Sequence, residues 1–596
     1  MKAASFTSWE INDTTMPLLF LIQSMEEMLF PYGHDSYKVP ALNFHFICVE
    51  ILSCIEKIEY EVVDKGNMKP LFEELEAMFG MDDIAKKLYG HDFSSLFYAK
   101  NDKGEYNRDI SQLRKNPSDE ISIKRIQRTI SFLLDDMNIN DKYFNTLKNE
   151  ISDVLHCGQI SVSEQKRILS LSRLFLTEVI NRGYSQEYVY SCIRERYYSD
   201  KNTISNIDEE LDYIWNLFSF ENKKYRVILP VKRAETKKYL THFQNVEIRE
   251  NDMKYFGNSC RWIVVVDVEA YEPQKAREEA TALIELFAGL KQYSRHKSRV
   301  FYANQAIVQD LETGKDFILK KPVQLMSRRR EKNEQLVFAQ IGELILTFPV
   351  IGEKMINVIN LHTSALESTN VSNQLLNLWT IVEVLVEVDK RYSYNKITQI
   401  SNTLTTVLNS SYIKSLVEQL SLDLSHCVNE FADILDAIDT TGDEIIKLTA
   451  LLVLPQYQEN KELLLGKLNE YPLLVYRIKH YSDIFSNRRN LKEYLNTHRK
   501  RLEWQIIRIY RNRNMIVHDG THFPYIDVIV QNLHYYIDTL IDCIIYYVDK
   551  GYGSLESIYT YMGHNEYQNC LLFEKKDDDN KDLAIMDDFI HVVLGE

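Results

Sequence analysis

The stretch RNRNMIVHDG, Arg511 to Gly520, contains residue types that can cleave RNA without a metal ion. Two arginines, each followed by an asparagine, precede His518; four residues separate it from Arg513 and six from Arg511. An imidazole, with an ordinary pKa of about 6.5, can accept or donate a proton at neutral pH. A guanidinium stays charged and can bind a phosphate through two N–H groups. These groups suit attack of a ribose 2′-OH on the neighbouring phosphate.

In that reaction His518 would act as the general base that removes the 2′-OH proton. Arg513, or alternatively Arg511, would stabilise the charge that develops on the phosphorus. The chemistry needs no metal ion or cofactor, and DNA would be spared because it lacks the 2′-OH. The leaving 5′-oxygen still needs an acid, which a second copy of His518 across a two-fold dimer would supply.

A basic segment leads to this stretch. Between Arg477 and Arg513 the chain has eleven basic and three acidic residues, a net charge of +8 in a chain whose total is −16. A local basic surface suits a polyanion, whereas the acidic remainder limits indiscriminate binding. Alternatively, these basic residues form an ordinary solvent-exposed helix face that binds no ligand. We expect six side chains of the segment to contact RNA phosphates: Arg488, Arg489, Arg499, Lys500, Arg501 and Arg508.

Two helices are expected to position these groups. The pattern predicts a helix over 501–517 that ends near His518, with Gly520 as its C-terminal cap. Upstream, LLNLWTIVEVL (375–385) has the wide apolar stripe of a buried helix, with Glu383 one turn after Trp379. A last long helix is expected from Ile526 onward.

RNRNMIVHDG and LLNLWTIVEVL together resemble the HEPN superfamily, and in particular its Apea-like domains. The resemblance covers about residues 360–550, a third of the chain. Arg513 and His518 match the catalytic pair of the family, Asn514 matches the polar residue that follows the arginine, and Glu383 matches an auxiliary acid. The resemblance implies a helical bundle that dimerises to form a composite, metal-independent ribonuclease site.

The same resemblance implies an endoribonuclease that leaves a 2′,3′-cyclic phosphate and a 5′-OH, acting in abortive anti-phage defence. Expected partners are RNA, with tRNA as one candidate, a second copy in a homodimer or a higher even-numbered oligomer, and a phage-derived trigger. Two alternatives remain open. One is a non-catalytic HEPN module that binds RNA or protein and regulates a defence complex. In the other, Arg513 and His518 only cap a helix and bridge a dimer.

The whole chain is expected to be mostly α, because 19 Gly and 12 Pro in 596 residues leave few helix breakers. A helical region over 1–220, with a sensor or regulatory role, precedes a small α/β domain over 221–335. That domain has strands near Tyr225–Val231 and Trp262–Val268, and a hairpin around Gly314. A HEPN bundle over 336–555 and an acidic tail over 556–596 complete the chain.

The sequence disfavours disulfide-rich, metal-binding, secreted and membrane-spanning proteins. The eight cysteines are scattered, with no C-x-x-C pair and no metal-ligand spacing, so we expect neither a disulfide framework nor a metal site. The N-terminus lacks a secretory signal, and no apolar run approaches the ~20 residues needed to cross a bilayer. We therefore expect a soluble, cytoplasmic protein without a membrane partner.

Overall fold

The structure is a computed structural model. It describes residues 6, 8–30, 42–97, 99–100, 106–107, 110–158, 160–199, 202–231, 245–251, 255–256, 260–295, 305–320, 334–368, 370–387 and 396–573.

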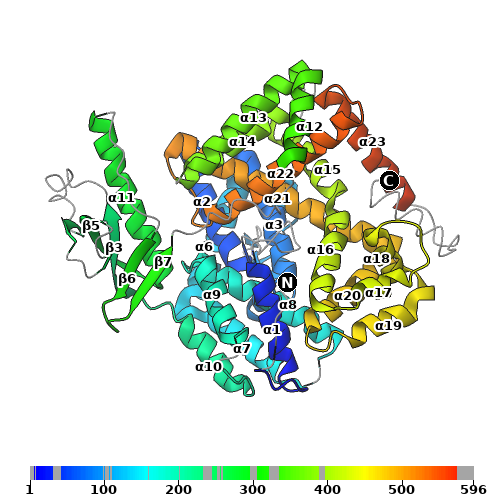
Figure 1. The fold of residues 1–596 in the computed structure, drawn as a ribbon. Coiled ribbons are helices and arrows are strands. Elements are labelled where there is room, and N and C mark those ends of the chain that lie inside the picture. Colours follow the sequence, from blue (N-terminus) through cyan, green and yellow to red (C-terminus); the bar gives the residue numbers. More distant parts are fainter. Residues whose placement is uncertain are drawn as a thin grey trace. The chain divides into compact units, whose positions relative to one another are not determined.

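Helices dominate the described chain, and a small sheet lies in its middle region, which confirms the predicted mostly-α fold class (Figure 1). The chain forms two compact units. The first unit combines Met1–Thr177 with Met326–Glu596, and the second is Glu178–Leu325. This grouping differs from the four regions expected from the sequence, because the N-terminal helices pack with the C-terminal helices instead of forming a separate body.

The N-terminal part of the first unit consists of short and medium helices. Side-chain caps set several starts: Asn43 accepts a hydrogen bond from the Phe46 amide at the start of α2, and Asp82 accepts from the Ile84 and Ala85 amides at the start of α4. The helices are α1 Met16–Leu29, α2 Phe44–Glu59, α3 Met68–Met81, α4 Asp83–Tyr89, α5 Ser111–Lys115, α6 Glu120–Asn138, α7 Lys142–Leu155 and α8 Val162–Asn181, whose last turn extends into the second unit. A small ladder, β1 Ala99–Lys100 with β2 Tyr106–Asn107, and 3-10 turns at Lys65–Asn67, Phe93–Leu96 and Ile139–Asp141 join them.

The C-terminal part of the first unit is also helical. Its helices are α12 Glu334–Thr347, α13 Pro349–Glu367, α14 Val371–Leu385, α15 Lys396–Ser410, α16 Tyr412–Cys427, α17 Phe431–Asp436, α18 Glu444–Val453, α19 Gln458–Gly466, α20 Pro472–Phe485, α21 Arg488–Asp519, α22 Ile526–Asp549 and α23 Leu555–Phe573, with a 3-10 turn at Pro455–Tyr457. The first part of the region expected as an acidic tail over 556–596 is helix α23. Residues 574–596 lie outside the described residues.

Polar side chains join the two parts of the first unit, whose blue and orange helices share one helical body in Figure 1. The buried Gln23 of α1 donates to the Glu470 carbonyl at 2.7 Å and accepts from the Leu473 amide at 3.2 Å, which satisfies the backbone where α20 begins. Arg477 of α20 bridges Glu27 of α1 at 3.2 Å.

The second unit holds a five-stranded antiparallel sheet with the order β4-β5-β3-β6-β7. Its strands are β3 Lys223–Val231, β4 Val246–Glu250, β5 Trp262–Ala270, β6 Gln305–Asp310 and β7 Asp316–Lys320, and its other elements are α9 Gln186–Tyr197, α10 Ile207–Leu217 and α11 Pro273–Arg295. The two predicted strands correspond to β3 and β5, and the predicted hairpin is β6–β7, with Gly314 at φ 70° in its turn. In the described part of the chain, no helix is long and apolar enough to cross a membrane.

Candidate active site

Helix α21 carries the motif at its C-terminal end. The helix starts at Arg488, where the Asn487 side chain accepts hydrogen bonds from two backbone amides, and it ends at Asp519. Gly520 follows in the left-handed region at φ 68°, and its amide bonds to the Ile516 carbonyl. The predicted end and glycine cap are confirmed, and the helix begins thirteen residues earlier than predicted.

Two arginines of this helix are part of a buried ion network. Arg508 and Arg511 are at most 1% exposed, as are Glu50 of α2 and Glu74 of α3. Arg508 Nε donates to Glu50 at 2.8 Å and its Nη2 donates to Glu74 at 2.6 Å, while Arg511 donates to the other Glu50 oxygen. Two guanidiniums and two carboxylates cancel in charge, as a buried cluster requires.

The electrostatics of the network centre on Glu50. Burial alone would raise the pKa of Glu50, but the two guanidiniums outweigh burial and lower it overall. Glu50 is therefore ionised at neutral pH and bound to both arginines. Removing either arginine would leave a buried carboxylate with too few partners.

Two expectations are corrected by this network. Arg508 was expected to contact RNA, but it is fully buried and committed to Glu50 and Glu74. Arg511 was the alternative catalytic arginine, but it is buried and committed to Glu50. Neither guanidinium is available to a phosphate in this structure. Of the two arginines in the motif, Arg513 is the one that is not fully buried.

The first asparagine of the motif is also structural. Asn512 is fully buried, its amide nitrogen donates to the Arg508 carbonyl at 3.0 Å, and its oxygen accepts from the Phe523 amide at 3.1 Å. It thereby fixes the chain that follows Gly520 against the last turns of α21.

The second half of the motif is more open. Arg513 and Asn514 are half-buried, and Arg513 Nη1 donates to the Asn514 side-chain oxygen at 3.2 Å. His518 is exposed in the last turn of α21. Next to it, Asp519 pairs with Lys57 of α2 at 2.6 Å and accepts from the Thr521 hydroxyl at 2.6 Å. This end of α21 is therefore accessible while its flanks are anchored.

Helix α14 brings Glu383 into electrostatic range of Arg513. Trp379 Nε1 donates to Glu383 at 2.9 Å, the Lys396 ammonium lies 2.9 Å from the same oxygen, and the Trp379 ring packs on Tyr510 of α21. Burial raises the pKa of Glu383, but Lys396, Trp379 and the charge of Arg513 lower it overall. An ionised carboxylate can orient a cation; it cannot donate a proton.

The remaining predicted RNA contacts lie toward the start and middle of α21. Arg489 is 82% exposed and pairs with Glu493 at 3.0 Å, and Lys500 is 58% exposed. Arg488 is half-buried in the first turn of the helix.

Two further basic side chains that were expected to contact RNA instead contact other parts of the protein. Arg499 is bound to Glu503 at 3.3 Å and to Glu566 of α23. Arg501 is half-buried and approaches the Met81 sulfur at 3.6 Å. Arg477 pairs with Glu27 and Asp423, and the buried Arg508 and Arg511 pair with Glu50 and Glu74, so much of the +8 charge is balanced by acidic residues elsewhere in the first unit. The basic surface is therefore smaller than the sequence suggested.

Glu50, Glu74 and Lys57 support the motif and were not predicted from the sequence. One signal was present for Glu50, since it lies three residues after Ile47 and four before Cys54, inside the apolar stripe of α2. A charged residue in that stripe indicates a buried ionic partner. The sequence alone does not reveal that the partner is 458 residues away.

Within the described residues, no group of three or more histidine, cysteine, aspartate or glutamate side chains is arranged to hold a metal ion. Comparison with known proteins adds no relative: no family model matches the chain, and neither a curated protein nor a solved structure is significantly similar to it.

Proposed function

We propose that the protein is a metal-independent endoribonuclease of the HEPN type, with His518 as the general base and Arg513 as the group that stabilises the charged phosphorus. The observation that carries the proposal is the contrast within one motif. Arg508, Arg511 and Asn512 are buried in the fold, whereas Arg513 and Asn514 are half-buried and His518 is exposed. In this proposal Glu383, whose pKa is lowered in part by the charge of Arg513, assists by orienting that arginine. Cleavage by 2′-OH attack would leave a 2′,3′-cyclic phosphate and a 5′-OH.

The geometry of α21 favours a site completed by a second copy. Five residues along an α-helix correspond to roughly 7.5 Å and roughly 140° of rotation. Arg513 and His518 of one chain therefore leave the helix on different sides. In a two-fold dimer, each histidine can meet the arginine of the partner, and the two histidines can serve as base and acid.

The test maps RNA ends after incubation with purified protein in the presence of a chelator. Wild type should produce new 5′-OH ends, and His518→Ala and Arg513→Ala should reduce cleavage by about 10²-fold or more. His522→Ala is the matched control, because His522 lies four residues beyond His518 and its ring hydrogen-bonds to the backbone carbonyl of Phe523 at 2.9 Å. Equal cleavage by wild type and His518→Ala would overturn the assignment.

A second function, a non-catalytic module that binds RNA or protein, is favoured by the exposed Arg489 and Lys500. It predicts RNA retention in a gel-shift assay that weakens in an Arg489→Gln, Lys500→Gln double variant, with no new RNA ends from wild type. A role in abortive anti-phage defence, a phage-derived trigger and tRNA as a substrate belong to the proposal through the HEPN resemblance. A cytoplasmic location belongs to it through the scattered cysteines and the missing secretory signal.

A further inference from the structure

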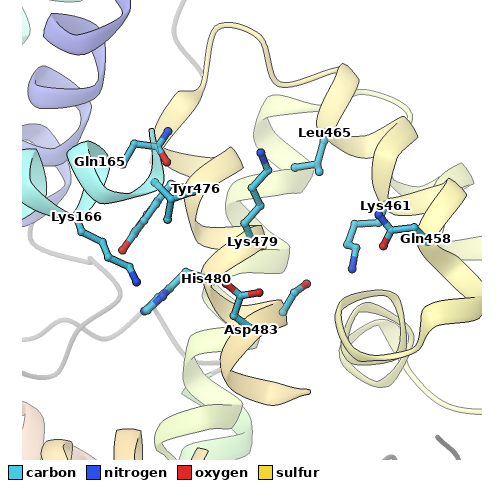
Figure 2. Close-up of a pocket in the computed structure, with 11 residues that line it drawn as sticks. Gln165, Lys166, Gln458, Lys461, Leu465, Tyr476, Lys479, His480 and Asp483 are labelled. Atoms are coloured by element: carbon cyan, nitrogen blue, oxygen red, sulfur yellow. The ribbon is translucent and has the colours of Figure 1, made fainter. Parts of the chain in front are cut away.

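A basic pocket lies in the first unit, away from the motif. It has a volume of about 280 Å³, is open to solvent on one side and is lined by the start of α8, by α19 and by α20 (Figure 2). Lys166 comes from α8, Lys461 from α19, and Lys479 and Asp483 from α20. The lining thus contains three lysines and one aspartate, which gives it an excess of two positive charges.

Two basic side chains of the lining are partly withdrawn from solvent, Lys461 and His480. Burial lowers the pKa of Lys461, with Asp483 opposing the shift. Burial, followed by the charge of Lys166, lowers the pKa of His480, which keeps this imidazole neutral at neutral pH. An anion in the pocket would compensate the partly buried ammonium of Lys461, and phosphate is a common ligand of lysine side chains.

The other lining residues suit a ligand that has polar and apolar parts in addition to an anionic group. The Ser482 hydroxyl beside the pocket is buried and has no hydrogen-bond partner among the described residues. The amides of Gln165 and Gln458 add further polar groups, and Leu465 and Tyr476 add apolar surface. The Tyr476 ring stacks on His480, with centroids 5.4 Å apart and 12° between the planes.

The size limits the ligand. Pockets for small molecules typically span about 300–1,000 Å³, so this pocket is at the lower end and suits one small molecule, not a stretch of polymer. We propose that the pocket formed by α8, α19 and α20 binds a small phosphorylated ligand of mononucleotide size. Its phosphates meet Lys166, Lys461 and Lys479, and its uncharged part lies against Leu465 and Tyr476.

The experiment is isothermal titration calorimetry of the full chain with pyrophosphate, AMP, ADP, ATP and adenosine as probes. At least one phosphorylated probe should bind saturably with one site per chain. Lys461→Gln and Lys479→Gln should each weaken that binding by about tenfold. Lys467→Gln is the matched control, because it removes the same charge just beyond α19, where Lys467 pairs with Glu430 at 3.1 Å. Circular dichroism spectra of all variants check that they are folded.

The proposal is independent of RNA cleavage, so His518→Ala should bind the probe as wild type does. Three results would overturn it: no saturable binding of any phosphorylated probe at about millimolar concentration, equal affinity in wild type and both lysine variants, or adenosine binding as tightly as its phosphates. Binding of a single-stranded oligonucleotide that depends on Lys461 and Lys479, while the mononucleotides do not bind, would replace the small ligand with RNA.

Discussion

Glu50 of α2 binds Arg511 of α21 with one carboxylate oxygen and Arg508 with the other, and all three side chains are buried. The motif that carries the proposed chemistry is therefore anchored to the N-terminal part of the chain, 461 residues away in sequence. The two arginines of RNRN have different tasks: Arg511 holds the helix, and Arg513 is left at the more open end.

Replacing each of the two arginines with alanine should consequently have a different effect on stability and on cleavage. Arg511→Ala leaves Glu50 short of a partner and should lower the free energy of unfolding by about 3–5 kcal/mol. Arg513→Ala, at a half-buried position, should change it by only about 0.5 kcal/mol while abolishing RNA cleavage. Urea denaturation of both variants, beside the cleavage assay, makes the comparison. A stable but inactive Arg511→Ala and an active Arg513→Ala would reverse the assignment.

The two asparagines form a similar matched pair. Asn512→Ala removes hydrogen bonds to the Arg508 carbonyl and the Phe523 amide in a buried site, which should cost about 1–3 kcal/mol and raise the hydrogen-exchange rate of the Phe523 amide. Asn514→Ala loses only the contact to Arg513, so its effect on unfolding should be about 0.5 kcal/mol or less. Similar losses for the two variants would contradict the structural role of Asn512.

Local patterns predicted the parts of the fold that depend on local rules. Gly520 ends α21 because a residue in the left-handed region is needed there, and β3, β5 and the hairpin follow from β-branched runs and a turn. The spacing between arginine and histidine admitted both Arg511 and Arg513, and the burial of Arg511 distinguishes the two.

What could not be predicted depends on contacts far apart in the chain. Arg508 has the same local sequence features as an exposed basic residue. Its burial is explained by its ion pairs with Glu50 and Glu74, which come from distant helices. The grouping of residues 1–177 with 326–596 is likewise a result of tertiary packing, which composition and periodicity do not encode.

Glu383 is expected to act through Arg513 and not as a proton donor. Its lowered pKa keeps it ionised at neutral pH. Glu383→Gln should therefore reduce the maximal rate of RNA cleavage by about tenfold without moving the pH dependence of the rate. Lys354→Gln, which breaks a surface pair between α13 and Glu387 near the end of α14, is the control and should leave the rate unchanged. A shifted pH profile in Glu383→Gln would indicate that the carboxyl exchanges a proton during the reaction.

The buried His534 of α22 should make the first unit sensitive to acid. It is 1% exposed, neither ring nitrogen has a hydrogen-bond partner among the described residues, and burial, followed by the charge of His362, lowers its pKa from 6.5 to about 3. As the pH falls below 6.5, the unfolded chain binds this proton while the folded chain does not, so stability is lost between these two pH values. The loss from this one group is at most about 1.4 kcal/mol per pH unit.

His534→Leu removes the titrating group while keeping an apolar side chain in the buried site. Its free energy of unfolding, measured by urea denaturation at pH 7, 6, 5 and 4, should fall less steeply with acidity than that of wild type. His564→Leu, at an exposed position of α23, should follow the wild-type curve. Parallel curves for wild type and His534→Leu would mean that His534 takes up no proton on unfolding, and that the acid sensitivity arises from other groups.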